Sequence, residues 1–189
     1  MTSRSIVLCL VLVFSGPMTS PLFAADEAKE SEPPQKLNKF KKPKSSKKLI
    51  DTNIKNFKVW INKRKWKKKI TDDPHKINLI YKDEGAHVIL IAEKVQVPVK
   101  ALRTVVLRSM EVSATDVEVL REENRLVNGV EVLFLKTRVE MNLIRYIFVG
   151  YYYTGEAGTF QAMALTEQDL FDHYKTQLMD FLNGIDISD

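Results

Sequence analysis

The chain has 189 residues, a formal net charge of +5 and one cysteine, Cys9. Because Cys9 lies in an N-terminal apolar run that we expect to be removed, the mature protein has no thiol for a disulfide, a nucleophile or a metal. Residues 36–69 hold 15 Lys or Arg against one acid, whereas residues 70–189 hold 12 against 19. The basic excess therefore belongs to the segment that leads into the fold, and the body of the fold is acidic.

The first 25 residues match a secretory signal peptide. Arg4 precedes an apolar run over residues 6–14, and Ala24 and Ala25 offer a cleavage site. The run has about half of the ~20 apolar residues that a membrane-spanning helix needs, so we expect no transmembrane segment after cleavage. The sequence predicts a periplasmic or secreted protein, which removes ATP, NAD(P)H and most cytosolic partners from consideration.

Residues 26–54 read as a linker. The segment is rich in Lys and Pro, and it offers too little apolar surface to offset the entropy cost of ordering it. We expect it to be disordered. The remaining residues, 55–189, are enough to form one domain with a single core.

Alternating apolar residues predict the first strands of this domain at residues 57–61 and 77–81, with a loop around Trp66 between them. Residues 86–93 predict a third strand, which is apolar on both faces and should therefore be covered on both sides of the sheet. Pro98 suits the first position of a helix of about 13 residues, because it needs no amide partner there.

The second half of the domain predicts four strands and a long helix. The strand patterns lie at residues 117–120, 130–135, 144–151 and 160–165. The Asn128-Gly129 pair marks a hairpin turn, and the strand at 144–151 should lie near the sheet centre. Thr166 and Asp169 resemble a capping box at the start of the helix. Its buried stripe should be Phe171, Tyr174, Leu178, Phe181 and Leu182.

The order β-β-β-α-β-β-β-β-α predicts an α+β fold. Short hairpin connections favour a mainly antiparallel sheet, and strands that are apolar on both faces need cover on both sides. We therefore expect about seven strands flanked by two helices.

Several short runs resemble a known family. These runs are residues 128–132, 150–155, 158–161 and 181–184. Over residues 57–187 the chain resembles small secreted bacterial domains of the PsbP-like α/β/α sandwich group. The resemblance implies an accessory role in protein complexes or at the envelope, and it identifies no catalytic residue.

The signals for catalysis are weak. No Ser lies in a Gly-x-Ser-x-Gly turn, and Glu122 and Glu123 are neighbours on a strand and so point to opposite faces. The three histidines lack the spacing that brings metal ligands together. We predict a protein that is not an enzyme, with no catalytic residue, cofactor or metal; the alternative is an unrecognised hydrolase.

Two features could bind a partner. Tyr152, the middle of three tyrosines, could present an aromatic platform, although core packing explains the same pattern. The stronger signal is a run of six cations around one tryptophan: Lys63, Arg64, Lys65, Trp66, Lys67, Lys68 and Lys69.

The basic run could bind anionic lipid, lipopolysaccharide or an acidic polymer. The alternative is a solvated tail with no partner, or one that contacts the acidic body. Nucleic acid is the usual partner of such a run in the cytosol, and export argues against it. The sequence thus predicts an exported binding or accessory protein, whose partner is an anionic envelope component or another extracytoplasmic protein.

Overall fold

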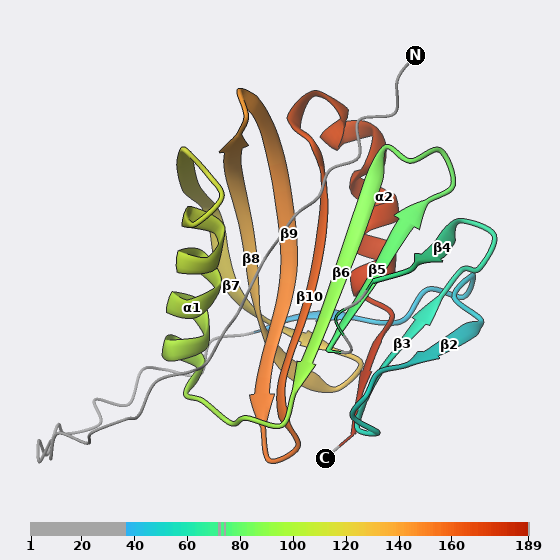
Figure 1. Cartoon of the computed structure of the whole chain (residues 1–189). Coiled ribbons are helices and arrows are strands. Elements are labelled where there is room, and N and C mark those ends of the chain that lie inside the picture. The colour runs from blue at the N-terminus through green and yellow to red at the C-terminus, as the bar shows by residue number, and fades with distance from the viewer. Residues whose placement is uncertain (1–36, 72, 74, 189) are drawn as a thin grey trace, which may run out of the picture.

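The computed structural model describes residues 37–188 apart from 72 and 74. Figure 1 shows a large twisted sheet with α1 (Val99–Glu111) on one face and α2 (Phe171–Leu182) on the other. The spatial order of its eight strands is β1 (Asn38–Phe40), β7 (Asp116–Val127), β8 (Val130–Met141), β9 (Ile144–Gly155), β10 (Gly158–Glu167), β6 (Ala86–Glu93), β5 (Lys76–Tyr81) and β4 (Trp66–Lys69). All neighbours are antiparallel except β1 and β7, so the predicted α+β class is confirmed with eight strands instead of about seven.

A second, antiparallel sheet has the order β11 (Ile185–Ile187), β3 (Phe57–Ile61) and β2 (Lys48–Asp51), and it lies beside α2 in Figure 1. The predicted strand at residues 57–61 is therefore the middle strand of this small sheet and does not belong to the large one. Its alternation has the expected cause, because Phe57, Val59 and Ile61 are buried against the α2 side of the large sheet.

The core has two layers, one on each face of the large sheet. On one face α1 contributes Leu102, Val106 and Met110. On the other face α2 buries the five residues that the sequence predicted. The strands β6 and β9 are buried on both faces, as predicted, and the central strand β10 between them is buried on both faces as well.

The structure differs from the predicted linker over residues 37–54, where it places β1 and β2. The backbone of these strands finds partners in β7 and β3, and Phe40 and Ile50 pack against the core. The side-chain oxygen of Asn128 accepts a hydrogen bond from the Lys42 N–H at 2.7 Å. The sequence did not predict these strands, because their basic side chains point outward and give no apolar alternation, and because the partner of β1 lies far along the chain. The predicted signal peptide and residues 26–36 lie outside the described residues.

Two local predictions are wrong. The loop expected around Trp66 is β4, which pairs with β5; its three lysines face solvent and hide the strand pattern. The capping box does not form, because Thr166 belongs to β10 and its hydroxyl donates to the Gly85 carbonyl at 2.7 Å. A short 3₁₀ turn, η1 (Gln168–Leu170), separates this strand from α2, so the helix begins later than predicted.

The other helix has the predicted length but begins one residue after the predicted start, and the hairpin turn matches its prediction. Pro98 is the N-cap of α1, and its carbonyl accepts the first helical hydrogen bond, from the Leu102 N–H, at 3.0 Å. Asn128 and Gly129 both have positive φ, as the tight turn between β7 and β8 requires. In the part of the chain that the structure describes, no helix is long and apolar enough to cross a bilayer.

Candidate functional site

Two tight turns meet at one rim of the fold. The first covers residues 43–46 and is closed by a hydrogen bond of 3.0 Å from the Ser46 N–H to the Pro43 carbonyl. The second covers residues 62–66, where the N–H groups of Lys65 and Trp66 donate to the Asn62 carbonyl at 2.9 and 3.1 Å. Both turns line a small hollow together with the C-terminal half of α2, so segments that are separate in sequence form one surface.

Each turn is anchored by a buried residue. Ser46 is 5% exposed and Trp66 is 4% exposed. The Trp66 ring packs edge-on against Tyr81 of β5 and Phe181 of α2, with centroids 5.1 and 5.0 Å apart. Trp66 therefore fixes the second turn to the core and does not reach a partner in solvent.

An open depression of about 450 Å³ lies between the two turns. Four of its lining residues are exposed cations, Lys47 and Lys48 from the first segment and Lys63 and Arg64 from the second. The rest of the lining is Ser45, Ile61 and Asn62. None of the four cations forms an ion pair with a carboxylate within the described residues.

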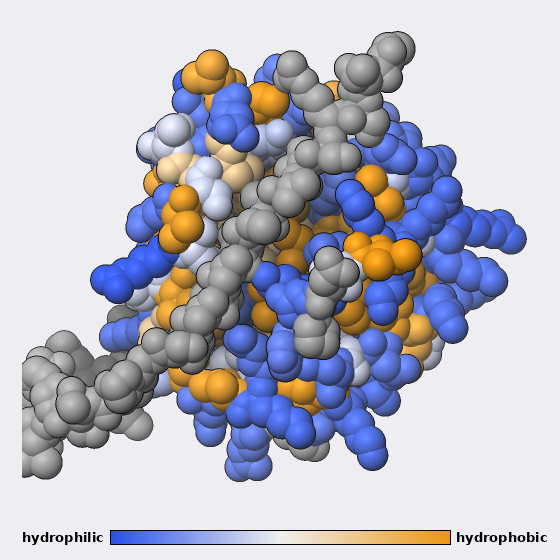
Figure 2. Space-filling model, viewed as in Figure 1, coloured by the Kyte–Doolittle hydropathy of each residue, from blue (hydrophilic) through white to orange (hydrophobic). Residues whose placement is uncertain are grey.

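The lysines of β4 extend this positive surface along the last strand of the large sheet. Lys67, Lys68 and Lys69 are exposed, and alternation sends Lys68 to the face opposite its two neighbours. We call the following eight residues the cationic patch: Lys47, Lys48, Lys63, Arg64, Lys65, Lys67, Lys68 and Lys69. In Figure 2, hydrophilic side chains project from the side of the molecule where β2, β3 and β4 lie.

The patch also acts on a neighbouring histidine. His87 of β6 is half-buried, and burial is the main reason that its pKa lies below the ordinary value of 6.5. The positive charge of Lys69 lowers this pKa further. The imidazole therefore favours its neutral form beside the lysines.

The cationic depression includes two of the cations that the sequence predicted as binding residues and two lysines that it did not. Five of the six predicted cations, Lys63, Arg64 and Lys67–Lys69, are exposed and Lys65 is half-buried; of the six, Lys63 and Arg64 line the depression. Lys47 and Lys48 were missed as binding residues, because the sequence assigned them to a linker. The sequence signal for these two lysines is the basic run that contains them. Only the pairing of Lys48 with Ile61 brings this run next to the run at residues 63–69.

Tyr152 is 2% exposed and faces the α1 side of the sheet, so it presents no platform to solvent. Its ring lies against Gly150, where a Cβ would come within 2.5 Å of the Tyr152 hydroxyl. Burial raises the pKa of this hydroxyl well above its ordinary value. These contacts support the packing interpretation of Tyr152.

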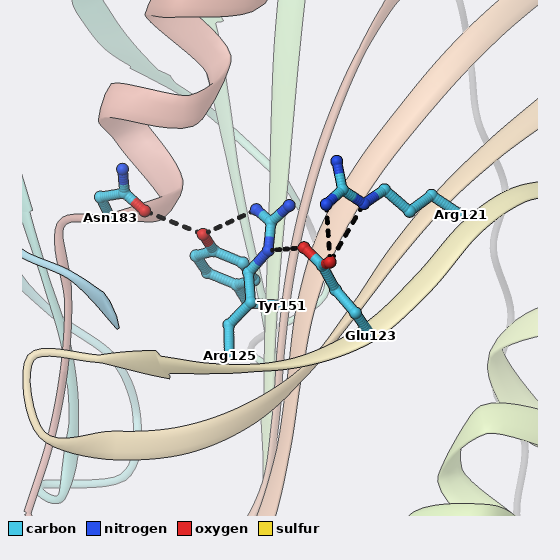
Figure 3. Close-up of polar contacts among 5 residues, drawn as sticks. All are labelled: Arg121, Glu123, Arg125, Tyr151 and Asn183. Atoms are coloured by element: carbon cyan, nitrogen blue, oxygen red, sulfur yellow. Dashed lines mark hydrogen bonds and ion pairs between the residues drawn. The ribbon is translucent and has the colours of Figure 1, made fainter. Parts of the chain in front are cut away.

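A buried polar cluster lies at the other end of the sheet, where Figure 3 shows Arg125 between Glu123 and Tyr151. Arg125 pairs with the Glu123 carboxylate at 2.5 Å and donates to the Tyr151 hydroxyl at 3.3 Å. The Tyr151 hydroxyl donates in turn to the side-chain oxygen of Asn183 at 2.8 Å. The cluster joins β7, β9 and the end of α2, and its charges neutralise one another, so we assign it to stability.

The carboxylate of Glu123 has opposing influences on its pKa. Burial acts to raise the pKa, but hydrogen bonds and charges from Arg125 and Arg121 outweigh it and lower the pKa below 4.5. The neighbouring Glu122 points to the other face of the strand and pairs with Arg103 of α1 at 2.8 Å. The two carboxylates therefore serve separate ion pairs.

The histidines lie in three separate parts of the fold. His87 is on β6, His173 is on α2, and His75 precedes β5, where its ring nitrogen is 3.0 Å from the Asn53 amide. Among residues 37–188 without 72 and 74, no group of three His, Cys, Asp or Glu side chains could hold a metal ion.

No protein-family model matches the chain, and no curated protein matches its sequence. The structure is similar to cyanobacterial PsbP (CyanoP) from Synechocystis sp. PCC 6803, with a TM-score of 0.55 and 12% identity, over 76% of this chain and 94% of that one. This similarity confirms the PsbP-like fold.

Weaker similarities extend to two further solved structures. The protein of unknown function PA94 from Pseudomonas aeruginosa gives a TM-score of 0.43 and 11% identity over 62% of this chain and 79% of that one. LpqN, involved in cell envelope biogenesis of Mycobacterium tuberculosis, gives 0.35 and 12% over 78% of each chain. The similarity to CyanoP and the geometry of the rim together define a PsbP-like fold that carries a cationic depression.

Proposed function

We propose that this protein is an exported accessory module, without catalytic activity, that docks on an anionic component of the envelope through the cationic patch. The component is an anionic lipid layer, lipopolysaccharide or an acidic polymer. The proposal depends mainly on one observation, that two separate basic segments line one depression and that their four cations there have no carboxylate partner among the described residues.

Within the described residues, no ion pair joins a carboxylate of the acidic body to the cationic patch. Four of its glutamates pair with arginines of the same body, in the pairs Glu118–Arg138, Glu122–Arg103, Glu123–Arg125 and Glu140–Arg145. These contacts leave the lysines of the rim available for an external partner. They argue against the alternative in which the basic run serves only to contact the rest of the chain.

The available energy is sufficient for a reversible surface interaction. Each exposed cation contributes about 1 kcal/mol near an anionic membrane, so five simultaneous contacts give about 5 kcal/mol. This corresponds to a dissociation constant in roughly the sub-millimolar range. Because the charges are exposed, the interaction should weaken as salt shortens the Debye length from about 10 Å at 0.1 M to about 3 Å at 1 M.

Co-sedimentation with vesicles tests the proposal. The protein should bind phosphatidylglycerol-containing vesicles at low salt, release them at high salt and ignore pure phosphatidylcholine. Replacing Lys67, Lys68 and Lys69 with Gln should cost about 2 kcal/mol, or roughly 30-fold in partitioning, because only Lys67 and Lys69 share a face of β4 and can contact one surface together.

The matched control replaces three exposed lysines outside the patch, Lys94, Lys100 and Lys175, with Gln. It makes the same change in net charge and should change binding far less. Equal losses in the two variants, or binding that salt does not weaken, would contradict docking through the patch. Specific capture of another extracytoplasmic protein without vesicle binding would instead favour a protein partner.

A further inference from the structure

We propose that the depression between the two turns is a binding pocket for a phosphate monoester, the doubly charged group of a phosphorylated sugar or lipid headgroup. This inference rests on the proposed function, and it names the chemical group that one part of the patch selects. The β4 lysines would supply general attraction, and the depression would supply the preference for one anion.

The lining of the depression combines several kinds of phosphate-binding group. Arg64 carries a planar guanidinium that can hold two phosphate oxygens at once, and Lys47, Lys48 and Lys63 add compact positive charges. The hydroxyl of Ser45 and the amide of Asn62 add neutral polar groups. A volume of about 450 Å³ falls within the usual range of small-molecule pockets.

The backbone of the pocket is already ordered. The Asn62 side-chain oxygen accepts a hydrogen bond of 3.0 Å from the Arg64 N–H, which fixes the turn that carries Arg64. Buried Ser46 and Trp66 hold the two turns in place, and the pairing of Lys48 with Ile61 sets the distance between them. Binding therefore has to order only the long side chains, which reduces its entropy cost.

The charge of the pocket favours a dianion. Four cations share this depression, none of them pairs with a carboxylate in the part of the chain that the structure describes, and they repel one another. A phosphate monoester carries a charge of about −1.5 to −2 at pH 7, so it relieves this repulsion more than a singly charged phosphodiester does. The β4 lysines differ, because alternation spreads them over two faces of an edge strand.

The test follows backbone amide shifts by NMR during titration with glucose 6-phosphate, with glucose as the neutral control. Saturable shifts should concentrate at residues 45–48 and 61–64. Replacing Lys63 and Arg64 with Gln should weaken binding by about tenfold or more, because it removes two charge-assisted contacts. The matched variant with Lys94 and Lys100 replaced by Gln makes the same change in net charge and should change binding by no more than about twofold, since both residues are exposed and lie outside the pocket and the patch.

A second arm compares vesicles that contain phosphatidic acid with phosphatidylglycerol vesicles of equal surface charge. If the protein prefers phosphatidic acid and only the Lys63/Arg64 variant loses this preference, the phosphate monoester is that of a lipid headgroup. Saturable binding of glucose 6-phosphate supports the phosphate of a soluble sugar instead. Arg64→Lys should weaken either response several-fold although it keeps the charge. Unchanged thermal unfolding of each variant shows that it remains folded.

Failure of both arms, or equal losses in the two double variants, would overturn the pocket. Retained binding to phosphatidylglycerol vesicles in that case would leave the proposed docking function standing. Loss of all vesicle binding by the unmodified protein would contradict the docking function itself.

Discussion

Replacing Trp66 separates the two roles that a tryptophan in a basic run can have. If Trp66 anchors the turn from inside the core, as its 4% exposure and its contacts with Tyr81 and Phe181 indicate, Trp66→Ala should mainly reduce stability. A buried tryptophan removes about 200 Å² from water, which at about 25 cal/mol per Å² gives about 5 kcal/mol. This agrees with the roughly 3–5 kcal/mol that Trp→Ala substitutions cost in cores.

Such a loss approaches the entire stability of a typical domain, about 5–15 kcal/mol, so Trp66→Phe is the more informative variant. It keeps an aromatic ring and should cost about 1–3 kcal/mol in urea unfolding. Vesicle binding by the folded Trp66→Phe protein should equal that of the unmodified protein. A variant that unfolds like the unmodified protein but loses vesicle binding would refute the core role and restore Trp66 as a surface contact.

The remaining predictions concern charge. Lys69→Gln should raise the pKa of His87 toward 6.5, as NMR titration of the imidazole would show, because it removes one of the two causes of the lowered value. An unchanged pKa would leave burial as the only cause. Glu123→Gln should destabilise the protein by about 3 kcal/mol or more, because it leaves buried Arg125 without its counter-ion. The lowered pKa of Glu123 stabilises the fold above pH 4.5, and this contribution is lost as the pH falls through the lowered value, so acid unfolding should be less steep in the variant. Equal pH dependence in both proteins would remove Glu123 from that account.

Much of the fold could be predicted because the pattern of apolar residues in its central elements matches the faces that are buried. Residues of β6 and β9 are apolar on both faces since helices or the small sheet cover both sides. The stripe of α2 was read correctly from Phe171 to Leu182 because one face of that helix meets the core. In these elements the local pattern and the tertiary contacts agree.

The edges could not be predicted in the same way. The strands β1, β2 and β4 are short and mostly exposed, so lysines occupy positions that carry no periodic apolar signal. Their order depends on distant partners, such as the pairing of Asn38 with Arg125. For the same reason, only part of the candidate site could be predicted. The charge run identifies Lys63 and Arg64 as candidate binding residues, whereas Lys47 and Lys48 come next to them only through the pairing of β2 with β3.

Mapping of the membrane-bound protein tests the central claim most directly. Amide hydrogen exchange, measured with and without phosphatidylglycerol vesicles, reports which backbone segments a bound surface protects. Docking through the cationic patch predicts new protection at residues 45–48 and 62–69, with α1 unchanged. Protection that is concentrated on α1, or a bound protein with no protection at either basic segment, would contradict it.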